Sequence, residues 1–347
     1  MANAPLSVLV IGTGKRVLST ALPAFAAHAD KFQIARLYAR RAKTITAAGS
    51  DYEVGAFENF SATDLEGIDL VYLAVTKDAV PQVLAKLTSL NVANADVLID
   101  TPVVRFKHFR HCARLNAFRN AWVAEDIAFL PWLDTLKAAF AAGDLGSLRT
   151  VILNQSAYAY HGVSLAKSVS GCNTIKIGRR KANTAHAGTR FMSLSSGVQI
   201  HIIEPRNYEA GSMIFAGSKG VVADYAFRED THVLEPLVEN GQITAFRCGE
   251  HSTKLTPAES ALTTGDPEGA TVTHRMNACK RVGFARLIES IATGGKSGGG
   301  YPVQEAMDDM VVDYHLEKFR TYRANPFTSA RSPLARMLLS LLSRAGG

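Results

Sequence analysis

The sequence predicts an α/β protein with two domains, the first built on a parallel sheet and the second, an α+β domain, on a large, mostly antiparallel sheet. Strand and helix patterns alternate over the first ~125 residues, longer strands with alternating polarity follow from about Leu148, and two helices close the chain. A chain of 347 residues is long enough for two separate cores. We therefore expect domains over residues 1–125 and 126–347.

Composition and charge argue against several classes of protein. The net charge of +7 is mild for this length, so no nucleic-acid partner is expected. The longest apolar run near the C-terminus, residues 337–342, is too short to span a bilayer. Four scattered cysteines without a CxxC spacing fit a reducing, cytoplasmic compartment, and no side chains have the spacing of a metal site.

Apolar runs in the first domain predict the strands of a parallel sheet. A strand over residues 8–11 is followed by a glycine turn and by a helix that begins around Lys15. Further strands are expected at FQIARLYA, DLVYLAV, ADVLID and AWVA, and helices over residues 80–90 and over FKHFRHCARLNAF. The last of these helices is expected to present one face at α-helical spacing, formed by Phe106, Phe109, Ala113 and Ala117.

The second domain is expected to consist of longer strands and hairpins. Alternating patterns begin at residues 150, 190 and 212, and the last of them contains a turn from Gly217 to Gly220. A second hairpin is predicted at Asn240-Gly241, because this dipeptide favours a type I′ turn. Helices over residues 279–292 and 303–319 end the domain, and an amphipathic tail that follows is expected to pack on the body.

The stretch SVLVIGTGKRVL, residues 7–18, places a strand, a glycine turn and a helix N-terminus in succession. Glycines let a phosphate approach the backbone, and the N–H groups of the first helical turn bind it. The arrangement is typical of a Rossmann dinucleotide-binding domain, although Val17 replaces the third glycine of the full motif. We expect this turn to bind a nucleotide cofactor through Gly12, Thr13, Gly14, Lys15 and Arg16.

The end of the second strand indicates which cofactor is preferred. Proteins that prefer NAD usually place Asp or Glu there to bind the ribose 2′-hydroxyl, whereas this chain has Arg40 and Arg41 and no acid between residues 38 and 43. Arginine can bind a 2′-phosphate with paired N–H donors, so NADP(H) is the expected cofactor. The alternative is that both arginines only face solvent.

Several segments resemble, in their order and spacing, the glucose–fructose oxidoreductase/inositol dehydrogenase/MocA (Gfo/Idh/MocA) family. They are the glycine turn, residues 38–41, DLVYLAVTKDAV and LIDTPV, with weaker matches at AEDIAFLPW, GDLGSLRTV and IFAGSKGVV. The resemblance covers nearly the whole chain. It implies a Rossmann domain, a C-terminal sheet domain that often mediates homo-oligomers, and hydride transfer on sugars or related polyols.

The chain departs from this family where the cofactor is expected to lie. In the family, strand four ends in Glu-Lys-Pro, and the lysine contacts the cofactor and assists proton transfer. The matching residues here are Asp100, Thr101 and Pro102, which the resemblance places beside the cofactor together with Thr76 of the preceding loop. In that loop, Lys77 either partly replaces the missing lysine or is solvated.

The family also carries Asp-x-x-x-His-x-x-Asp on a helix, which supplies its acid/base group. The best match is YHGVSLAK, residues 160–167, where Ser164 takes the place of the histidine and Lys167 that of the second aspartate. Tyr160, His161 and Lys167 are nevertheless proton-transfer types, because imidazole titrates near neutrality and burial lowers the pKa of a lysine. These three are the candidate catalytic residues; a structural histidine and a solvated lysine are the alternatives.

Together these observations predict an NADP(H)-dependent oxidoreductase acting on a carbonyl or hydroxyl carbon of a small, sugar-like or anionic molecule. Two other hypotheses remain. One is a redox-neutral enzyme, catalysing elimination or epimerisation with a tightly held cofactor. The other is a cofactor-binding sensor or assembly subunit without catalytic activity. The absence of the family's lysine, which assists proton transfer, favours this hypothesis.

Overall fold

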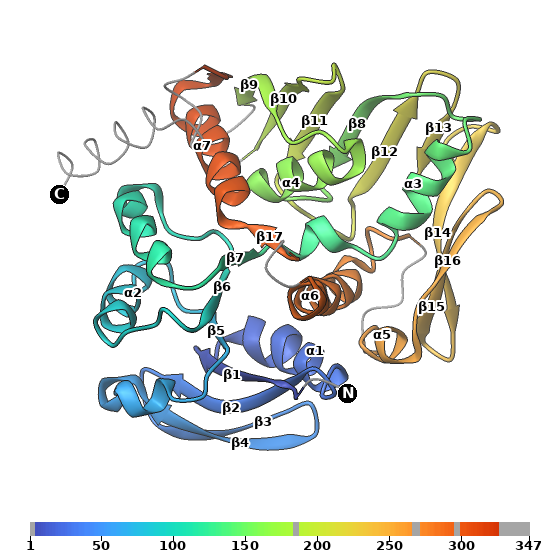
Figure 1. Cartoon of the computed structure of the whole chain (residues 1–347). Coiled ribbons are helices and arrows are strands. Elements are labelled where there is room, and N and C mark those ends of the chain that lie inside the picture. Colours follow the sequence, from blue (N-terminus) through green and yellow to red (C-terminus); the bar gives the residue numbers. More distant parts are fainter. Residues whose placement is uncertain (1–3, 183–186, 266–270, 295–298, 326–347) are drawn as a thin grey trace. The chain divides into compact units, whose positions relative to one another are not determined.

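The computed structural model describes residues 4–182, 187–265, 271–294 and 299–325, and its contacts divide these residues into two units (Figure 1). The first unit contains the chain up to Glu125 together with Phe284–Met307. The second contains Asp126–Gly283 and the described residues from Asp308 onward. The sequence-based division assigned everything after residue 125 to the second domain, whereas residues 284–307 pack with the first unit.

The first unit is built on a sheet with the strand order β17-β7-β6-β5-β1-β2-β4-β3 within the described residues. Six of its strands run parallel, and β3 and β17 pair antiparallel at the two edges. Val8, Leu9 and Val10 in β1 are completely buried, as expected of a central parallel strand covered on both faces. The strands are β1 (Leu6–Ile11), β2 (Phe32–Ala39), β3 (Lys43–Ala47), β4 (Ser50–Ala56), β5 (Leu70–Leu73), β6 (Asp96–Asp100), β7 (Ala121–Ala124) and β17 (Tyr301–Pro302).

Helical segments connect these strands. The helix after β1 contains a π-helical stretch, and the C-terminal half of α6 contributes Phe284, whose ring lies 5.4 Å from that of Tyr72 and 6.0 Å from that of Phe25. These aromatic contacts explain why residues from Phe284 onward belong to the first unit. The segments are η1 (Val17–Ala21), α1 (Leu22–Ala27), η2 (Phe57–Asn59), η3 (Ala62–Leu65), α2 (Val80–Ser89), η4 (Phe106–Ala117) and α6 (Met276–Thr293).

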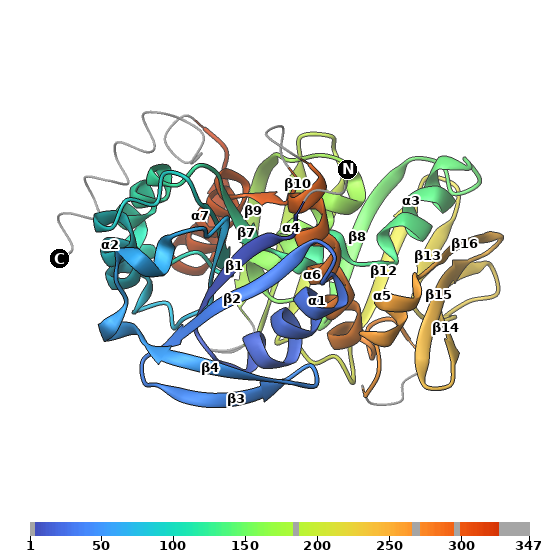
Figure 2. The same ribbon diagram turned by 60° about the horizontal axis from the view of Figure 1, so that its bottom comes forward.

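A hairpin that the sequence analysis did not predict follows β2. β3 and β4 pair antiparallel through a turn at Ala48 and Gly49, both with positive φ, and β4 then pairs parallel with β2 (Figure 2). The reason is local: the segment alternates polar and apolar residues with period two, which favours strands over a helix. The sheet thus gains an antiparallel edge, and residues 40–42 alone connect β2 to β3.

The helix predicted over FKHFRHCARLNAF is present but has 3₁₀ geometry, so the predicted apolar face is wrong. Ala113 and Ala117 are exposed, and the side chain of Phe106 lies outside the described ones. A 3₁₀-helix has three residues per turn, so its buried positions recur every third residue. The observed buried residues follow that period: Phe109, Cys112, Leu115 and Phe118.

The second unit has a sheet with the strand order β16-β15-β14-β13-β12-β8-β11-β10-β9-β18 within the described residues. Two pairings, β8–β11 and β13–β14, are parallel and the others are antiparallel, which confirms the predicted mostly antiparallel sheet. Its strands are β8 (Leu148–Asn154), β9 (Ile175–Ala182), β10 (Gly188–Leu194), β11 (Gln199–Glu204), β12 (Ser212–Gly217), β13 (Val221–Ala223), β14 (Thr231–Glu239), β15 (Gln242–Cys248), β16 (His251–Lys254) and β18 (Thr321–Arg323).

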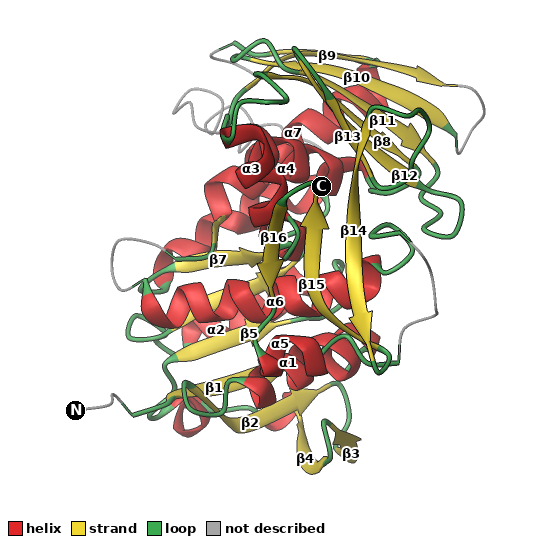
Figure 3. Cartoon of the chain, turned by 90° about the vertical axis from the view of Figure 1, so that its right-hand side faces the viewer, coloured by secondary structure: helices red, strands yellow, loops and turns green. Residues whose placement is uncertain are grey.

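Both predicted hairpins of this sheet are present. Gly217 donates its N–H to the carbonyl of Gly220 at 2.8 Å, and Asn240 and Gly241 both have positive φ between β14 and β15. Helices α3 and α4 pack against strands of this sheet, on the face seen in Figure 3. The remaining helical segments are η5 (Asp126–Phe129), α3 (Leu133–Ala141), α4 (Ala159–Ser170), α5 (Pro257–Ala261) and α7 (Val303–Phe319), of which α7 begins in the first unit.

None of the helices in the described part of the chain is both long and apolar enough to cross a membrane. The predicted amphipathic tail lies outside the described residues.

Candidate functional site

Gly12 closes the end of β1 against β5. Its φ is +118°, and a Cβ atom at this position would overlap the carbonyl oxygen of Ala74. The Gly12 amide donates to the carbonyl of Tyr38 at 2.7 Å, and the Ala74 amide donates to Ile11 at 2.9 Å. Glycine is therefore required here for the turn and for the close approach of the two strand ends.

Gly14 has a different role, because a Cβ atom there would meet no atom within 4 Å. The Gly14 carbonyl accepts hydrogen bonds from the amides of Val17, at 2.9 Å, and Leu18, at 3.2 Å, so the helix starts at this residue. The amides of a first helical turn have no partner within their own helix and carry the positive end of its dipole. Open space in front of such amides fits a dinucleotide phosphate group.

The other predicted residues of the turn differ in exposure. Thr13 is half-buried and Lys15 is exposed. Arg16 reaches across the carboxyl ends of the strands, where its Nε lies 3.3 Å from Asp100 Oδ1 and its Nη2 donates to the carbonyl of Ala124 at 3.4 Å. Arg16 thus contacts Asp100, a second predicted site residue, within the first unit.

Lys77 also lies at these strand ends; from the sequence alone it either partly replaces the missing family lysine or is solvated. Its Nζ donates to the backbone carbonyl of Asp100 at 2.7 Å, and its side chain is half-buried. Burial lowers the pKa of Lys77 to about 8; Asp100 opposes this shift and the Arg16 guanidinium adds to it. A loop lysine directed to the end of a neighbouring strand cannot be identified from local sequence pattern, because the contact depends on β5 and β6 pairing in parallel.

The end of β2 carries the two predicted arginines. Arg40 and Arg41 are both exposed, and they form no hydrogen bond or ion pair with the residues that the structure describes. Asp64 of η3, which contacts Tyr38 of β2, is already engaged: it accepts hydrogen bonds from Tyr38 Oη at 2.7 Å and from the amide and hydroxyl of Ser61 at 2.8 and 2.9 Å. Both guanidinium groups are therefore available to an anion.

The remaining cofactor candidates follow β5 and β6. Thr76 is exposed, and Thr101 and Pro102, joined by a cis peptide bond, are half-buried. Together with Asp100 they lie at the carboxyl edge of the parallel strands, where ligands of doubly wound sheets bind. The structure thus brings the predicted cofactor residues of the first unit to one edge of its sheet.

The three catalytic candidates lie on α4 of the second unit, in different surroundings. Tyr160 is half-buried and its ring centroid lies 4.3 Å from that of His161, which is only 7% exposed. Lys167, two turns on, is 3% exposed, and its Nζ is paired with the carboxylate of Asp309 on α7. The sequence did not single out Asp309.

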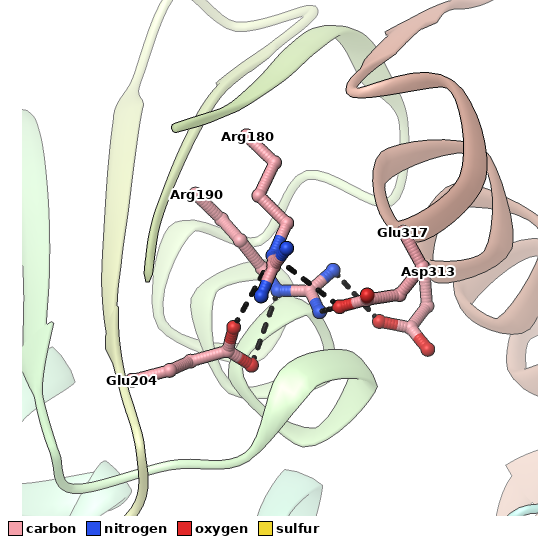
Figure 4. A network of polar contacts seen from close by, with 5 residues as sticks. All are labelled: Arg180, Arg190, Glu204, Asp313 and Glu317. Carbon is pink, nitrogen blue, oxygen red and sulfur yellow. Dashed lines mark hydrogen bonds and ion pairs between the residues drawn. The ribbon is translucent and has the colours of Figure 1, made fainter. Parts of the chain in front are cut away.

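Further charged side chains connect α7 to strands β9, β10 and β11 (Figure 4). Arg190 contacts Glu204 at 3.2 Å, Asp313 at 2.8 Å and Glu317, and Arg180 lies 3.3 Å from Glu317. Arg190 is 2% exposed, so its charge depends on these carboxylates. We call the five residues of Figure 4 the α7 charge network.

Within the described part of the chain, no group of three His, Cys, Asp or Glu side chains is placed to hold a metal ion.

Comparison with known proteins identifies the first unit. Residues 6–120 match the model of the Gfo/Idh/MocA family, described as an oxidoreductase family with an NAD-binding Rossmann fold. No curated protein sequence matches the chain significantly.

Solved structures share the fold over nearly all of the chain. A probable dehydrogenase from Thermotoga maritima is 12% identical, with a TM-score of 0.60 over 92% of this chain and 98% of that one. A putative myo-inositol dehydrogenase from Sinorhizobium meliloti is 14% identical, with a TM-score of 0.60 over 92% and 100%. An inositol dehydrogenase homolog from Azotobacter vinelandii, solved with NADH and myo-inositol, is 12% identical, with a TM-score of 0.57 over 92% and 98%.

The predicted resemblance and the predicted fold class are both confirmed by these matches. Residues 6–120 of this chain thus match the Gfo/Idh/MocA oxidoreductase family with its NAD-binding Rossmann fold, and the chain as a whole has the fold of these solved structures.

Proposed function

We propose that this protein is an NADP(H)-dependent oxidoreductase that transfers a hydride to or from a carbonyl or hydroxyl carbon of a small, sugar-like molecule. The observation that carries the proposal is the edge of the first sheet, where the open Gly14 turn and the two exposed arginines lie on adjacent strand ends. The family match of residues 6–120 and the NADH and myo-inositol bound to one structural neighbour support it.

The preference for NADP(H) rests on charge. A 2′-phosphate next to the ribose needs positive partners, and Arg40 and Arg41 have no other partner among the described residues. The carboxylate of Asp64 is already occupied by Tyr38 and Ser61, so it does not compete for a ribose hydroxyl. When bound, the nicotinamide supplies or accepts the hydride. The pyrophosphate of the cofactor would be held by the glycine turn, residues Gly12, Thr13, Gly14 and Lys15. The nicotinamide half would be bordered by Thr76, Asp100, Thr101 and Pro102.

Proton transfer to the substrate oxygen is assigned to α4, on either Tyr160 or His161. Each has a titratable group, and each is within one turn of the other. Lys167 is a weaker candidate, because loss of its proton would leave Asp309 charged and buried without its cation. The pair therefore supports a structural part for Lys167.

We further propose a homo-oligomer that forms through the sheet of the second unit. Ile177 on β9 and Phe191 on the adjacent strand β10 are 51% and 39% exposed, and the ring of His201 on β11 lies edge-on to that of Phe191, with 5.0 Å between the ring centroids. Exposed apolar side chains on adjacent strands favour association with a second copy. The F191D substitution should lower the mass measured by light scattering if this face is the interface.

The four free thiols fit the reducing cytoplasm in which we propose the protein works.

The function is tested by binding and turnover together. Titration of the protein with NADPH and NADH, followed by fluorescence, should give tighter binding of NADPH. A panel of sugars, inositols and their ketones should then show stoichiometric change of the cofactor with at least one compound. Turnover without net change of the cofactor would favour a redox-neutral enzyme, and tight binding without any turnover would favour a sensor.

A further inference from the structure

Two cations contact Asp100 at the carboxyl edge of the first sheet, one through its backbone carbonyl and one through its carboxylate. Lys77 Nζ contacts the Asp100 carbonyl at 2.7 Å, and Arg16 Nε contacts the Asp100 carboxylate at 3.3 Å. The neighbouring acid, Asp78, pairs instead with Arg105 at 3.0 Å and Lys107 at 3.3 Å. The Lys77 ammonium therefore brings a positive charge against a backbone carbonyl rather than against a carboxylate.

The strand order places this charge on a defined side of the turn. The sheet runs β6-β5-β1-β2, with the Gly14 turn after β1 and Arg40 and Arg41 after β2. A dinucleotide crosses such an edge with its pyrophosphate at the turn. If the adenosine 2′-phosphate lies at β2, as in the proposed function on which this inference rests, the nicotinamide half extends over the ends of β5 and β6. Lys77 lies at these ends.

The nicotinamide ring is a cation when oxidised and neutral when reduced. A fixed ammonium group on the nicotinamide side repels the oxidised ring and leaves the reduced ring unaffected, and partial burial strengthens the repulsion. We propose that Lys77 is a residue that makes this protein select the reduced cofactor over the oxidised one. The consequence is a bias of the enzyme toward reduction of a carbonyl substrate.

The pH dependence of cofactor binding provides a second test of the role of Lys77, because this lysine loses its charge as the pH rises. Burial lowers the pKa of this lysine to about 8, and the charged groups that act on it are Asp100, which opposes the shift, and Arg16, which adds to it. The ammonium is present below this pH and is lost above it. Discrimination between the two cofactor forms should therefore decrease as the pH rises through this range.

The test measures dissociation constants of NADPH and NADP⁺, and of NADH and NAD⁺, by fluorescence quenching and calorimetry without substrate. The variants are K77Q, which keeps a hydrogen-bond donor without the charge, and K77R, which keeps the charge. The matched control is K31Q, because Lys31 is a half-buried lysine paired with Glu289 before β2, at the opposite edge of the same sheet.

At about pH 7, K77Q should lower the ratio of oxidised to reduced dissociation constants by about tenfold, the size expected of one unit charge in a partly solvated site. K77R and K31Q should keep the wild-type ratio, and the wild-type ratio at about pH 9.5 should approach that of K77Q. An unchanged ratio in K77Q, with all four cofactors still bound, overturns the inference alone. Failure of wild-type protein to bind any of the four overturns the proposed function and this inference with it.

Discussion

Lys167 on α4 is paired with Asp309 on α7, and the two side chains are 4% and 3% exposed. Asp309 is followed on α7 by two further carboxylates at intervals of four residues, Asp313 and Glu317. All three meet basic side chains of the second unit, so α7 is held by charge as well as by apolar packing. These three carboxylates lie on one face of α7, because residues four apart lie on the same side of a helix with 3.6 residues per turn.

Removing one partner of this pair should destabilise the second unit. In K167M the Asp309 carboxylate stays buried without its cation, which costs about 3–5 kcal/mol, measured as the free energy of unfolding in urea. The double variant K167M/D309L should recover most of the loss, because both charges are then replaced by apolar groups. K137M, at an exposed lysine on α3, is the control and should change stability little. A loss below about 1 kcal/mol in K167M would contradict the buried pairing.

Substitutions at the two glycines of the turn should separate folding from cofactor binding. G12A places a Cβ atom against the Ala74 carbonyl and strains a positive φ, so it should lower the free energy of unfolding by about 3 kcal/mol or more. A Cβ atom at position 14 meets no atom within 4 Å, so the melting temperature of G14V without cofactor should stay within a few degrees of wild type. Its valine should nevertheless weaken NADPH binding by about tenfold or more. A stable G14V protein with wild-type affinity would show that phosphate does not lie in front of this residue.

Neutralising the two arginines after β2 should change cofactor preference. In R40Q/R41Q, the affinity for NADPH should fall by about a hundredfold and that for NADH by less than about threefold, because only NADPH carries the 2′-phosphate. R110Q/R114Q removes the same charge from exposed positions on η4 and controls for long-range attraction. If R40Q/R41Q lost affinity equally for NADPH and NADH, the proposed preference for NADP(H) would be contradicted.

The α7 charge network should give the protein an unusual pH dependence. Burial raises the pKa of Asp313 to about 6, with Arg190 opposing the shift. An unfolded aspartate titrates near 3.8, so between these values the folded protein binds a proton that the unfolded chain does not. Stability from this group therefore rises as the pH falls from about 6 to about 4, by at most ~3 kcal/mol.

The variant D313N cannot titrate and isolates this contribution. Unfolding free energies of wild type and D313N, compared at about pH 7 and about pH 4.5, should show the wild type gaining relative to the variant on acidification. A difference that is the same at both pH values would mean that Asp313 has its ordinary pKa in the folded protein.

Elements defined by local pattern could be predicted from the sequence. The buried run of β1, the glycine turn and the Asn240-Gly241 hairpin each depend on neighbouring residues, and each is present. The β3–β4 hairpin was missed although its signal was local: Ile45 and Ala47 alternate with polar residues, and Gly49 follows at a turn.

The contacts that give the candidate site its charge could not be predicted in this way. Lys167 and Asp309 are 142 residues apart in the sequence, and each alone resembles an ordinary helical charge. The local sequence around Lys77 is that of a solvated loop lysine. Only the parallel pairing of β5 with β6 brings the Asp100 carbonyl within 2.7 Å of its ammonium group. Such roles depend on which strands become neighbours, and local periodicity carries no information about that.

The hairpin after β2 also bears on how cofactor choice could evolve in this fold. Leu37 of β2 and Lys43 of β3 both pair with Val54 of β4, so the intervening residues 40–42 are fixed at both ends by the sheet and belong to no helix. Their side chains take no part in the buried core. Under the proposed assignment, the preference for NADP(H) or NAD(H) depends on this short exposed connection. Substitutions in residues 40–42 could therefore change the preferred dinucleotide during evolution without any repacking of the protein's core.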